Sequence, residues 1–248
     1  MKFSANLGFL WSDLSLPEAI VAAAKAGFDA VEFHWPYQQD RVQVLAALEQ
    51  TGLPLMGLNT LRGGEGQNGL CALPGFQAEA EQVIDQAFDW AQVLGAKNVH
   101  VMAGFAQGYE AHNQFLTNLA YASAKGEQTG VGILIEPLNR FDAPGYFLKD
   151  QAQALSIVNE LGKSNVKIMF DCYHVGRTEG DVIATYDKVK EQIGHVQFAS
   201  IPDRQEPDQA LQPILQHIYA SGWNAPMGAE YRPKETIDEG LGWLAHYR

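Results

Sequence analysis

The sequence predicts a single (β/α)8 barrel, an α/β TIM barrel, as one domain over residues 1–248. Short apolar runs alternate with longer amphipathic stretches eight times along the chain. A length of 248 residues is ordinary for such a barrel. No Pro/Ser-rich linker or low-complexity segment divides the sequence. A doubly wound sheet is the alternative, although the Gly-x-Gly-x-x-Gly turn and the P-loop of nucleotide-binding folds are both absent.

Each predicted strand is a short apolar run that is followed by a helix-like stretch. In chain order, we expect strands near residues 3–7, 29–34, 54–59, 97–102, 131–136, 166–171, 195–199 and 226–231. The first helix is expected to begin at a capping box formed by Ser15 and Glu18, with Pro17 in its first turn. Glycines placed to end helices in the left-handed conformation are Gly27, Gly52, Gly95, Gly130, Gly162 and Gly222.

The composition excludes several classes of partner. The formal net charge is −12, and an acidic surface is repelled by nucleic acid and by anionic membranes. No run approaches the roughly 20 apolar residues of a membrane span, and the N-terminus lacks a signal-peptide pattern. Cys71 and Cys172 are too few for a disulfide framework, so we expect a cytoplasmic protein. No motif indicates an oligomeric state; a homo-oligomer formed through exposed helices is compatible with the sequence.

The last four predicted strands of the sheet end on or near an oxygen-bearing side chain: Glu136, Asp171, Gln197 and Glu230. A carboxylate that closes an apolar strand needs a charge partner, a metal or a proton, because burying it alone is too costly. Taken singly, these residues could be solvated strand ends, a helix N-cap in the case of Asp171, or a structural amide in the case of Gln197. Together they form an oxygen-rich set that suits one hard divalent cation, Mg²⁺ or Mn²⁺, better than structural zinc.

Further polar residues surround this set. His174 follows Asp171 by three residues and is placed either to contact a ligand or to be a buried structural histidine. His100 and Glu32 extend the polar lining to strands four and two, with Glu32 more typical of lining than of a ligand. His195 lies one layer deeper than Gln197 and is expected in the core. Two long loops, 61–75 and 104–112, are expected at the C-terminal face of the barrel, as lids or clamps or as slack connections.

These residues stand in a pattern that resembles the hydroxypyruvate isomerase family, within the xylose isomerase-like barrels. The similarity spans nearly the whole chain. The strings that carry it are Phe3-Ser4-Ala5-Asn6-Leu7, Gly27-Phe28, Val31-Glu32-Phe33, His100-Val101-Met102-Ala103-Gly104, Ile135-Glu136-Pro137-Leu138-Asn139, Pro144-Gly145-Tyr146-Phe147-Leu148, Asp171 with His174, His195-Val196-Gln197, Pro202-Asp203-Arg204, Glu230-Tyr231-Arg232-Pro233 and Gly240-Leu241-Gly242-Trp243.

The resemblance implies which residues act. It implies that the divalent metal is bound by Glu136, Asp171, Gln197 and Glu230, that Glu136 and Glu230 transfer the proton, and that no nucleotide cofactor takes part. Related ketose 3-epimerases usually have histidine at the position of Gln197, so this glutamine favours the isomerase branch. The similar endonuclease IV barrel needs a histidine-rich three-zinc cluster, which seven scattered histidines do not indicate. Candidates for binding substrate oxygens are His100, His174 and Arg204.

The expected function is that of an intramolecular oxidoreductase interconverting aldose and ketose forms of a small hydroxy-oxo acid. Hydroxypyruvate, converted to 2-hydroxy-3-oxopropanoate (tartronate semialdehyde) through an enediol, is the first candidate. The alternatives are a ketose or keto-sugar epimerase, a 2-oxo-tetronate isomerase, and a non-catalytic barrel that binds metal or sugar acids. Two departures from the family bear on the substrate. Residues 66–69 read Gly-Gln-Asn-Gly where Gly-Glu-Arg-Gly is usual, and near 205–211 a Gly-Glu-Ile-Asn-Tyr segment is missing while Gln205 replaces a histidine.

Overall fold

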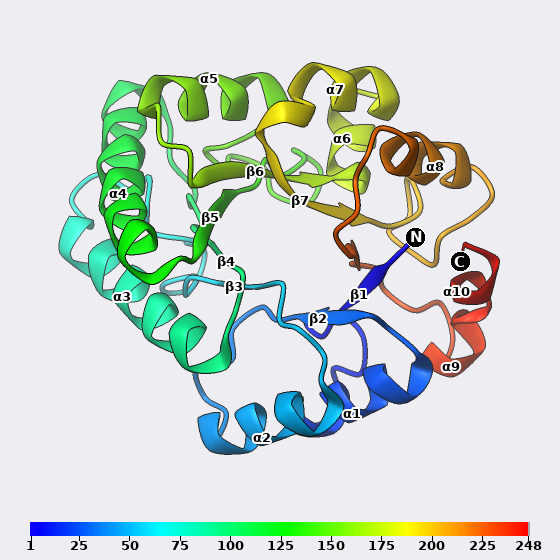
Figure 1. Cartoon of the computed structure of the whole chain (residues 1–248). Helices are drawn as coiled ribbons and strands as arrows, with labels where there is room; N and C mark the ends of the chain where they lie inside the picture. The colour runs from blue at the N-terminus through cyan, green and yellow to red at the C-terminus, as the bar shows by residue number, and fades with distance from the viewer. Residues whose placement is uncertain (248) are drawn as a thin grey trace.

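Eight parallel strands form the centre of the computed structural model, which describes residues 1–247, and helices surround them (Figure 1). The strands are β1 (Phe3–Asn6), β2 (Ala30–Glu32), β3 (Gly57–Asn59), β4 (Asn98–His100), β5 (Gly132–Ile135), β6 (Val166–Asp171), β7 (Ile193–Phe198) and β8 (Met227–Ala229). They hydrogen-bond in the order β2-β1-β8-β7-β6-β5-β4-β3. A parallel bridge from Val31 to Leu55 brings the two ends of the sheet together. The predicted single (β/α)8 barrel is therefore confirmed, and the doubly wound alternative is wrong.

The helices follow the strands as expected, with some differences in detail. They are α1 (Leu16–Ala26), α2 (Arg41–Thr51), α3 (Gln77–Leu94), α4 (Gly108–Thr129), α5 (Gln151–Leu161), α6 (Cys172–Thr178), α7 (Val182–Val189), α8 (Gln212–Ala220), α9 (Ile237–Gly240) and α10 (Gly242–His246), with a 3-10 turn at Lys190–Gln192. Two helices follow β6 and two short ones follow β8. The loop expected over 104–112 is wrong in its second half, because α4 already begins at Gly108.

Local chemistry explains where the helices begin and end. The Ser15 backbone N–H donates to Glu18 Oε2 over 3.1 Å at the start of α1, as the capping box predicts. The predicted glycines after α1, α2, α3, α4 and α5 all adopt positive φ as C-caps. Gly222 also has positive φ but lies one residue beyond Ser221, the C-cap of α8.

Apolar packing closes the barrel around the strands. Trp243 of α10 packs edge-on against Phe3 of β1 and Phe198 of β7, with ring centroids 5.2 and 5.6 Å apart. This contact attaches α10 to the two strands on either side of β8. Cys71 and Cys172 are buried and free. Within residues 1–247, none of the helices combines the length and apolar character needed to cross a membrane.

The glycine-rich segment 61–75 is fixed to the chain that follows β4. The Cys71 N–H donates to the Met102 carbonyl, and the Phe105 N–H donates to the Gln67 carbonyl over 3.0 Å. Gly104 has a φ of 96°, and a Cβ at this position would lie 2.2 Å from the Gly69 carbonyl oxygen. Two backbones thus approach each other at a point where only glycine fits. The segment is anchored here rather than slack.

This contact makes a stability prediction. Gly104→Ala is expected to lower the free energy of unfolding by about 3 kcal/mol. The new Cβ would collide with the Gly69 backbone, and alanine would also have to adopt a left-handed φ. Gly75→Ala is the matched control: its φ is 84°, but nothing lies within 4 Å of the added Cβ, so only about 1 kcal/mol should be lost. Equal losses in urea denaturation would contradict this reading.

Candidate active site

The four predicted metal ligands lie at the C-terminal rim of the barrel. Glu136 directly follows β5, Asp171 is the last residue of β6, Gln197 is the penultimate residue of β7, and Glu230 directly follows β8. All four side chains are buried. Glu136, Gln197 and Glu230 line one small cavity, and the carboxylates of Asp171 and Glu136 approach the same imidazole nitrogen, His174 Nε2, at 3.6 and 3.8 Å. The structure therefore brings together the residues that the strand ends predict.

Arg204 supplies the positive charge of this site. Its Nη2 atom lies 3.0 Å from Glu230 Oε2 and 3.5 Å from Asp171 Oδ2. Its guanidinium also packs over the rings of Phe9 and Tyr173, each at 4.9 Å. The backbone at Arg204 has a φ of 54°, a left-handed turn after β7 that directs the side chain back over the barrel. One guanidinium thus partly balances several buried carboxylates.

His34 belongs to the site, although it is not among the residues predicted from the sequence. Its Nε2 atom lies 3.0 Å from Glu230 Oε1. Gly8 leaves room for the imidazole, since a Cβ at Gly8 would lie 2.1 Å from His34 Nδ1. The available signal was strand parity: His34 follows Glu32 by two residues, and such residues point to the same face of an extended chain.

The two predicted substrate-binding histidines are held in opposite tautomers, and each has an N–H near Glu136: His174 Nε2 at 3.8 Å and His100 Nδ1 at 3.7 Å. His174 Nδ1 accepts hydrogen bonds from the backbone N–H and the side-chain amide of Asn139, at 3.0 and 2.8 Å. The backbone N–H fixes Nδ1 as an acceptor, so the proton of the neutral ring is on Nε2, which faces Glu136 and Asp171 and lies 3.3 Å from Arg204 Nη1, a second donor. His100 Nδ1 lies 3.2 Å from Asn59 Oδ1, an acceptor, so its proton is on Nδ1. The buried His100 Nε2 is left as a lone pair with no hydrogen-bond partner within residues 1–247.

Burial keeps both imidazoles neutral. Desolvation lowers the pKa of His100 to about 3. Desolvation, reinforced by the positive charge of Arg204, lowers the pKa of His174 to about 3 as well. At neutral pH, His174 therefore offers an N–H donor and His100 offers an acceptor, and neither adds a full charge.

The buried carboxyl groups differ in their surroundings. Burial raises the pKa of Glu136 well above its usual range, and the negative charges of Glu230 and Asp171 raise it further. Burial also raises the pKa of Asp171, to about 7, against the opposing effect of Arg204. Burial would raise the pKa of Glu230 too, but Arg204 and the hydrogen bond from His34 lower it to about 2. Glu136 and Asp171 therefore hold their protons more tightly than Glu230, which is ionised beside Arg204.

The donor atoms of this site fit a divalent cation. Two of the predicted ligands carry a buried oxygen for which the described part of the chain provides no hydrogen-bond partner, Glu136 Oε1 and Gln197 Oε1, while Glu230 Oε2 is paired only with Arg204, at 3.0 Å. Such atoms cost stability unless something binds them. The cavity they line is about 20 Å³, which is room for roughly one water-sized particle or ion. Glu136, Asp171 and His174 also offer atoms within 4.8 Å of one another, but the proton on His174 Nε2 makes that nitrogen a donor, not a ligand.

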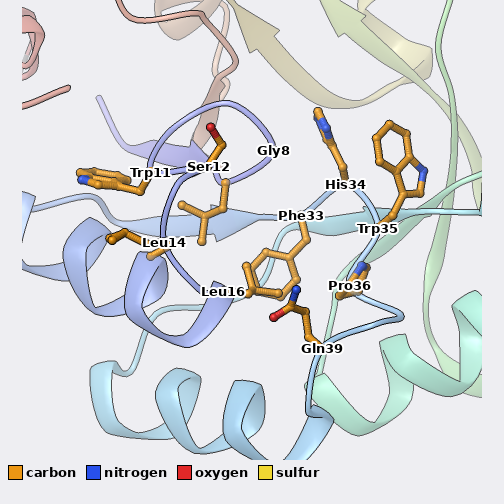
Figure 2. A pocket seen from close by; sticks show the side chains of 12 residues that line it. Gly8, Trp11, Ser12, Leu14, Leu16, Phe33, His34, Trp35, Pro36 and Gln39 are labelled. Atoms are coloured by element: carbon orange, nitrogen blue, oxygen red, sulfur yellow. The ribbon is translucent and has the colours of Figure 1, made fainter. Parts of the chain in front are cut away.

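A larger cavity adjoins the small one. It has a volume of about 250 Å³ and shares Phe33 and His34 with the small cavity. Figure 2 shows His34 and Trp35 side by side at one side of this space and Trp11 at the other. A molecule larger than an ion therefore has space next to His34, whose Nε2 atom contacts Glu230.

Comparisons with known proteins agree with the fold. Residues 20–247 match the family described as xylose isomerase-like TIM barrel. The chain is 38% identical over 255 residues to the 2-oxo-tetronate isomerase of Cupriavidus necator, covering 99% of this chain and 98% of that protein. It is 33% identical to the hydroxypyruvate isomerase of Escherichia coli, covering 100% of both chains. The crystal structure of an AP endonuclease, family 2, from Brucella melitensis superposes with a TM-score of 0.95 at 32% identity, covering 100% of this chain and 99% of that one.

These relatives confirm two expectations that follow from the sequence resemblance: the xylose isomerase-like barrel and an enzyme of the isomerase type. By the match over most of its length and by its identity to full-length relatives, the chain belongs to the xylose isomerase-like TIM barrel family.

Proposed function

We propose that the chain is a divalent-metal-dependent isomerase of a small hydroxy-oxo acid, with Glu136 and Glu230 as its proton-transferring pair. Hydroxypyruvate is the first candidate substrate. A 2-oxo-tetronate is the second, because the relative from Cupriavidus necator carries that name at 38% identity. One observation carries the proposal: two buried glutamates, which directly follow β5 and β8, line the same cavity at the rim of the barrel.

Glu136, Asp171, Gln197 and Glu230 would hold the cation, Mg²⁺ or Mn²⁺. The unpartnered oxygens of Glu136 and Gln197 support this assignment, and oxygen-rich sets favour hard cations. When bound, a divalent cation polarises a carbonyl and stabilises the negative charge that develops on its oxygen.

The chain's own residues account for the proton movements of such an isomerisation. One glutamate removes the proton from the hydroxyl-bearing carbon, and the electron pair of the broken C–H bond forms the double bond of a cis-enediol. The other glutamate gives a proton to the former carbonyl carbon. One oxygen must also gain a proton while its neighbour loses one. His174 offers an N–H and His100 a lone pair for these two roles, and Arg204 is the cation available to the substrate's carboxylate.

Metal affinity should depend on pH in a defined direction. Burial raises the pKa of Glu136 and raises that of Asp171 to about 7, so a cation has to displace protons from these carboxyl groups as the pH falls. We expect Mn²⁺ affinity of the metal-free protein to rise between pH 6 and pH 8, with release of protons. Calorimetry in two buffers of different ionisation enthalpy measures this release; an affinity independent of pH would contradict the assignment of these two ligands.

A substrate panel tests the function itself. Metal-free protein, with and without added Mn²⁺, would be assayed on hydroxypyruvate, 2-oxo-tetronates and a short series of ketoses. We expect turnover of a hydroxy-oxo acid that is lost with chelator and restored by Mn²⁺. Turnover of ketoses alone would favour an epimerase and sink the acid-isomerase proposal. Bound Mn²⁺ with no turnover of any compound would favour a non-catalytic binding barrel.

A further inference from the structure

We propose that Glu32 is a positioning residue that turns the amide oxygen of Gln197 toward the cation. This inference rests on the proposed metal site, but it concerns a residue that none of the proton transfers uses. Glu32 lies at the end of β2, is buried, and lines the same small cavity as Gln197, Glu136 and Glu230. Of the four proposed ligands, its hydrogen bonds reach Gln197.

Glu32 accepts hydrogen bonds from four different side chains. Its Oε1 accepts from Gln197 Nε2 at 2.8 Å and from Asn6 Nδ2 at 2.9 Å. Its Oε2 accepts from His195 Nε2 at 2.6 Å and from Ser4 Oγ at 3.1 Å. His195 is buried, as predicted, and its Nε2 hydrogen-bonds to this carboxylate. A carboxylate has only acceptor oxygens, so each neighbouring amide must turn its NH₂ group toward it.

The consequence for Gln197 is a single amide orientation. With Nε2 bound to Glu32, the carbonyl end of the amide must point elsewhere, and Gln197 Oε1 is buried without a partner among residues 1–247. Gln197 lines the same small cavity as Glu136 and Glu230. The flipped amide would set two acceptor oxygens against each other and present N–H groups to a cation, which is unfavourable on both sides.

Neighbouring residues preserve this arrangement. Asn6 Oδ1 accepts from the Gly8 N–H at 3.0 Å, which fixes the Asn6 amide so that its Nδ2 faces Glu32. Gly228 of β8 pairs in register with Gln197, and a Cβ there would lie 2.5 Å from Glu32 Oε1 and 2.9 Å from Gln197 Cγ. The glycine therefore leaves the space in which the Glu32–Gln197 pair forms.

The test is Mn²⁺ affinity of the metal-free protein, measured by calorimetry for Glu32→Gln in two backgrounds. With Gln197 present, an amide at position 32 can both donate and accept, so it no longer forces the Gln197 amide to turn its oxygen toward the cation. We expect Mn²⁺ affinity to fall about tenfold or more, as for other residues that orient metal ligands. With Gln197→Glu as the background, the same change should cost less than about threefold, because a carboxylate presents oxygen whichever way it turns. Equal losses in both backgrounds would show a merely structural role and overturn the inference.

Two further variants keep the result interpretable. Ser4→Ala removes a donor to the other oxygen of Glu32 and should leave Mn²⁺ affinity within about threefold of the unaltered protein. If Glu32→Gln does not fold, Gly228→Ala displaces the same pair without changing a polar group and should weaken Mn²⁺ binding; full affinity in that variant would overturn the inference. If the unaltered protein binds no Mn²⁺, the proposed metal site itself fails. If it binds and folded Glu32→Gln binds equally well, only the role of Glu32 fails.

Discussion

Glu230→Gln and Glu136→Gln are each expected to lower kcat by about 10²–10⁴-fold, the usual contribution of a positioned general acid or base. Both glutamates are buried on one cavity, where no water-exposed carboxylate can take over the proton transfer. Because each residue is also a proposed ligand, the comparison needs saturating Mn²⁺ and a measured metal content. Glu179→Gln is the matched control, because this carboxylate accepts from the Gln151 N–H at 2.8 Å and does not line the cavity. Its kcat should stay within about twofold, as for changes outside the site.

The two glutamate variants should differ from each other in a second way. If one glutamate takes the carbon proton and the other returns it, the variant that keeps the first glutamate can still exchange the substrate's carbon-bound hydrogen with solvent while forming no product. The other variant should neither exchange nor convert. Loss of less than about tenfold in kcat for both variants at full metal occupancy would contradict the paired-glutamate mechanism.

Arg204→Met is expected to destabilise the metal-free protein by about 3 kcal/mol, because it leaves Glu230 and Asp171 without their buried counter-charge. Arg204 lowers the pKa of both groups, so its removal raises these pKa values. A carboxyl whose pKa is raised by folding stabilises the folded state at low pH and loses that contribution as the pH rises through the folded-state pKa. The loss of stability should therefore be larger at pH 8 than at pH 5.

Mn²⁺ should then rescue the Arg204 variant. A cation bound among the same carboxylates replaces part of the missing positive charge, so Mn²⁺ should raise the unfolding temperature of Arg204→Met more than that of the unaltered protein. Arg177→Met is the control, because Arg177 donates to the Pro202 carbonyl and packs over the exposed Phe141 ring. It should change stability by no more than about 0.5 kcal/mol. Equal stabilisation of both proteins by Mn²⁺ would argue against a metal next to Arg204.

The part of the site that lies at strand ends could be predicted from the sequence, because the barrel topology fixes where those ends lie. Parallel strands of one barrel place their C-terminal ends at the same rim, so Glu136, Asp171 and Glu230 had to approach one another once the strands were assigned. Strand parity also places Glu32 inside the barrel and His195 one layer below Gln197. These inferences need only the two-residue period of a strand.

Other features depend on contacts that no local pattern encodes. Arg204 reaches the carboxylates from an irregular turn with positive φ, and a flexible side chain of that length can point in many directions. The hydrogen bond between His34 and Glu230 requires space for the imidazole, which Gly8 provides in the turn after β1. The tautomers of His100 and His174 follow from Asn59 and Asn139, residues distant in sequence. Such features become visible only once the packed barrel brings separate segments together.

The most direct test of the paired-glutamate isomerase is the conversion of hydroxypyruvate by the Mn²⁺ form in D₂O, followed by proton NMR. If one glutamate removes a proton and a different one delivers it, the carbon that was the carbonyl should receive a solvent deuteron in nearly every turnover. The double variant Glu136→Gln, Glu230→Gln should show neither product nor exchange. Product that keeps only its original carbon-bound hydrogens would indicate direct hydrogen transfer between the two carbons and would contradict the account.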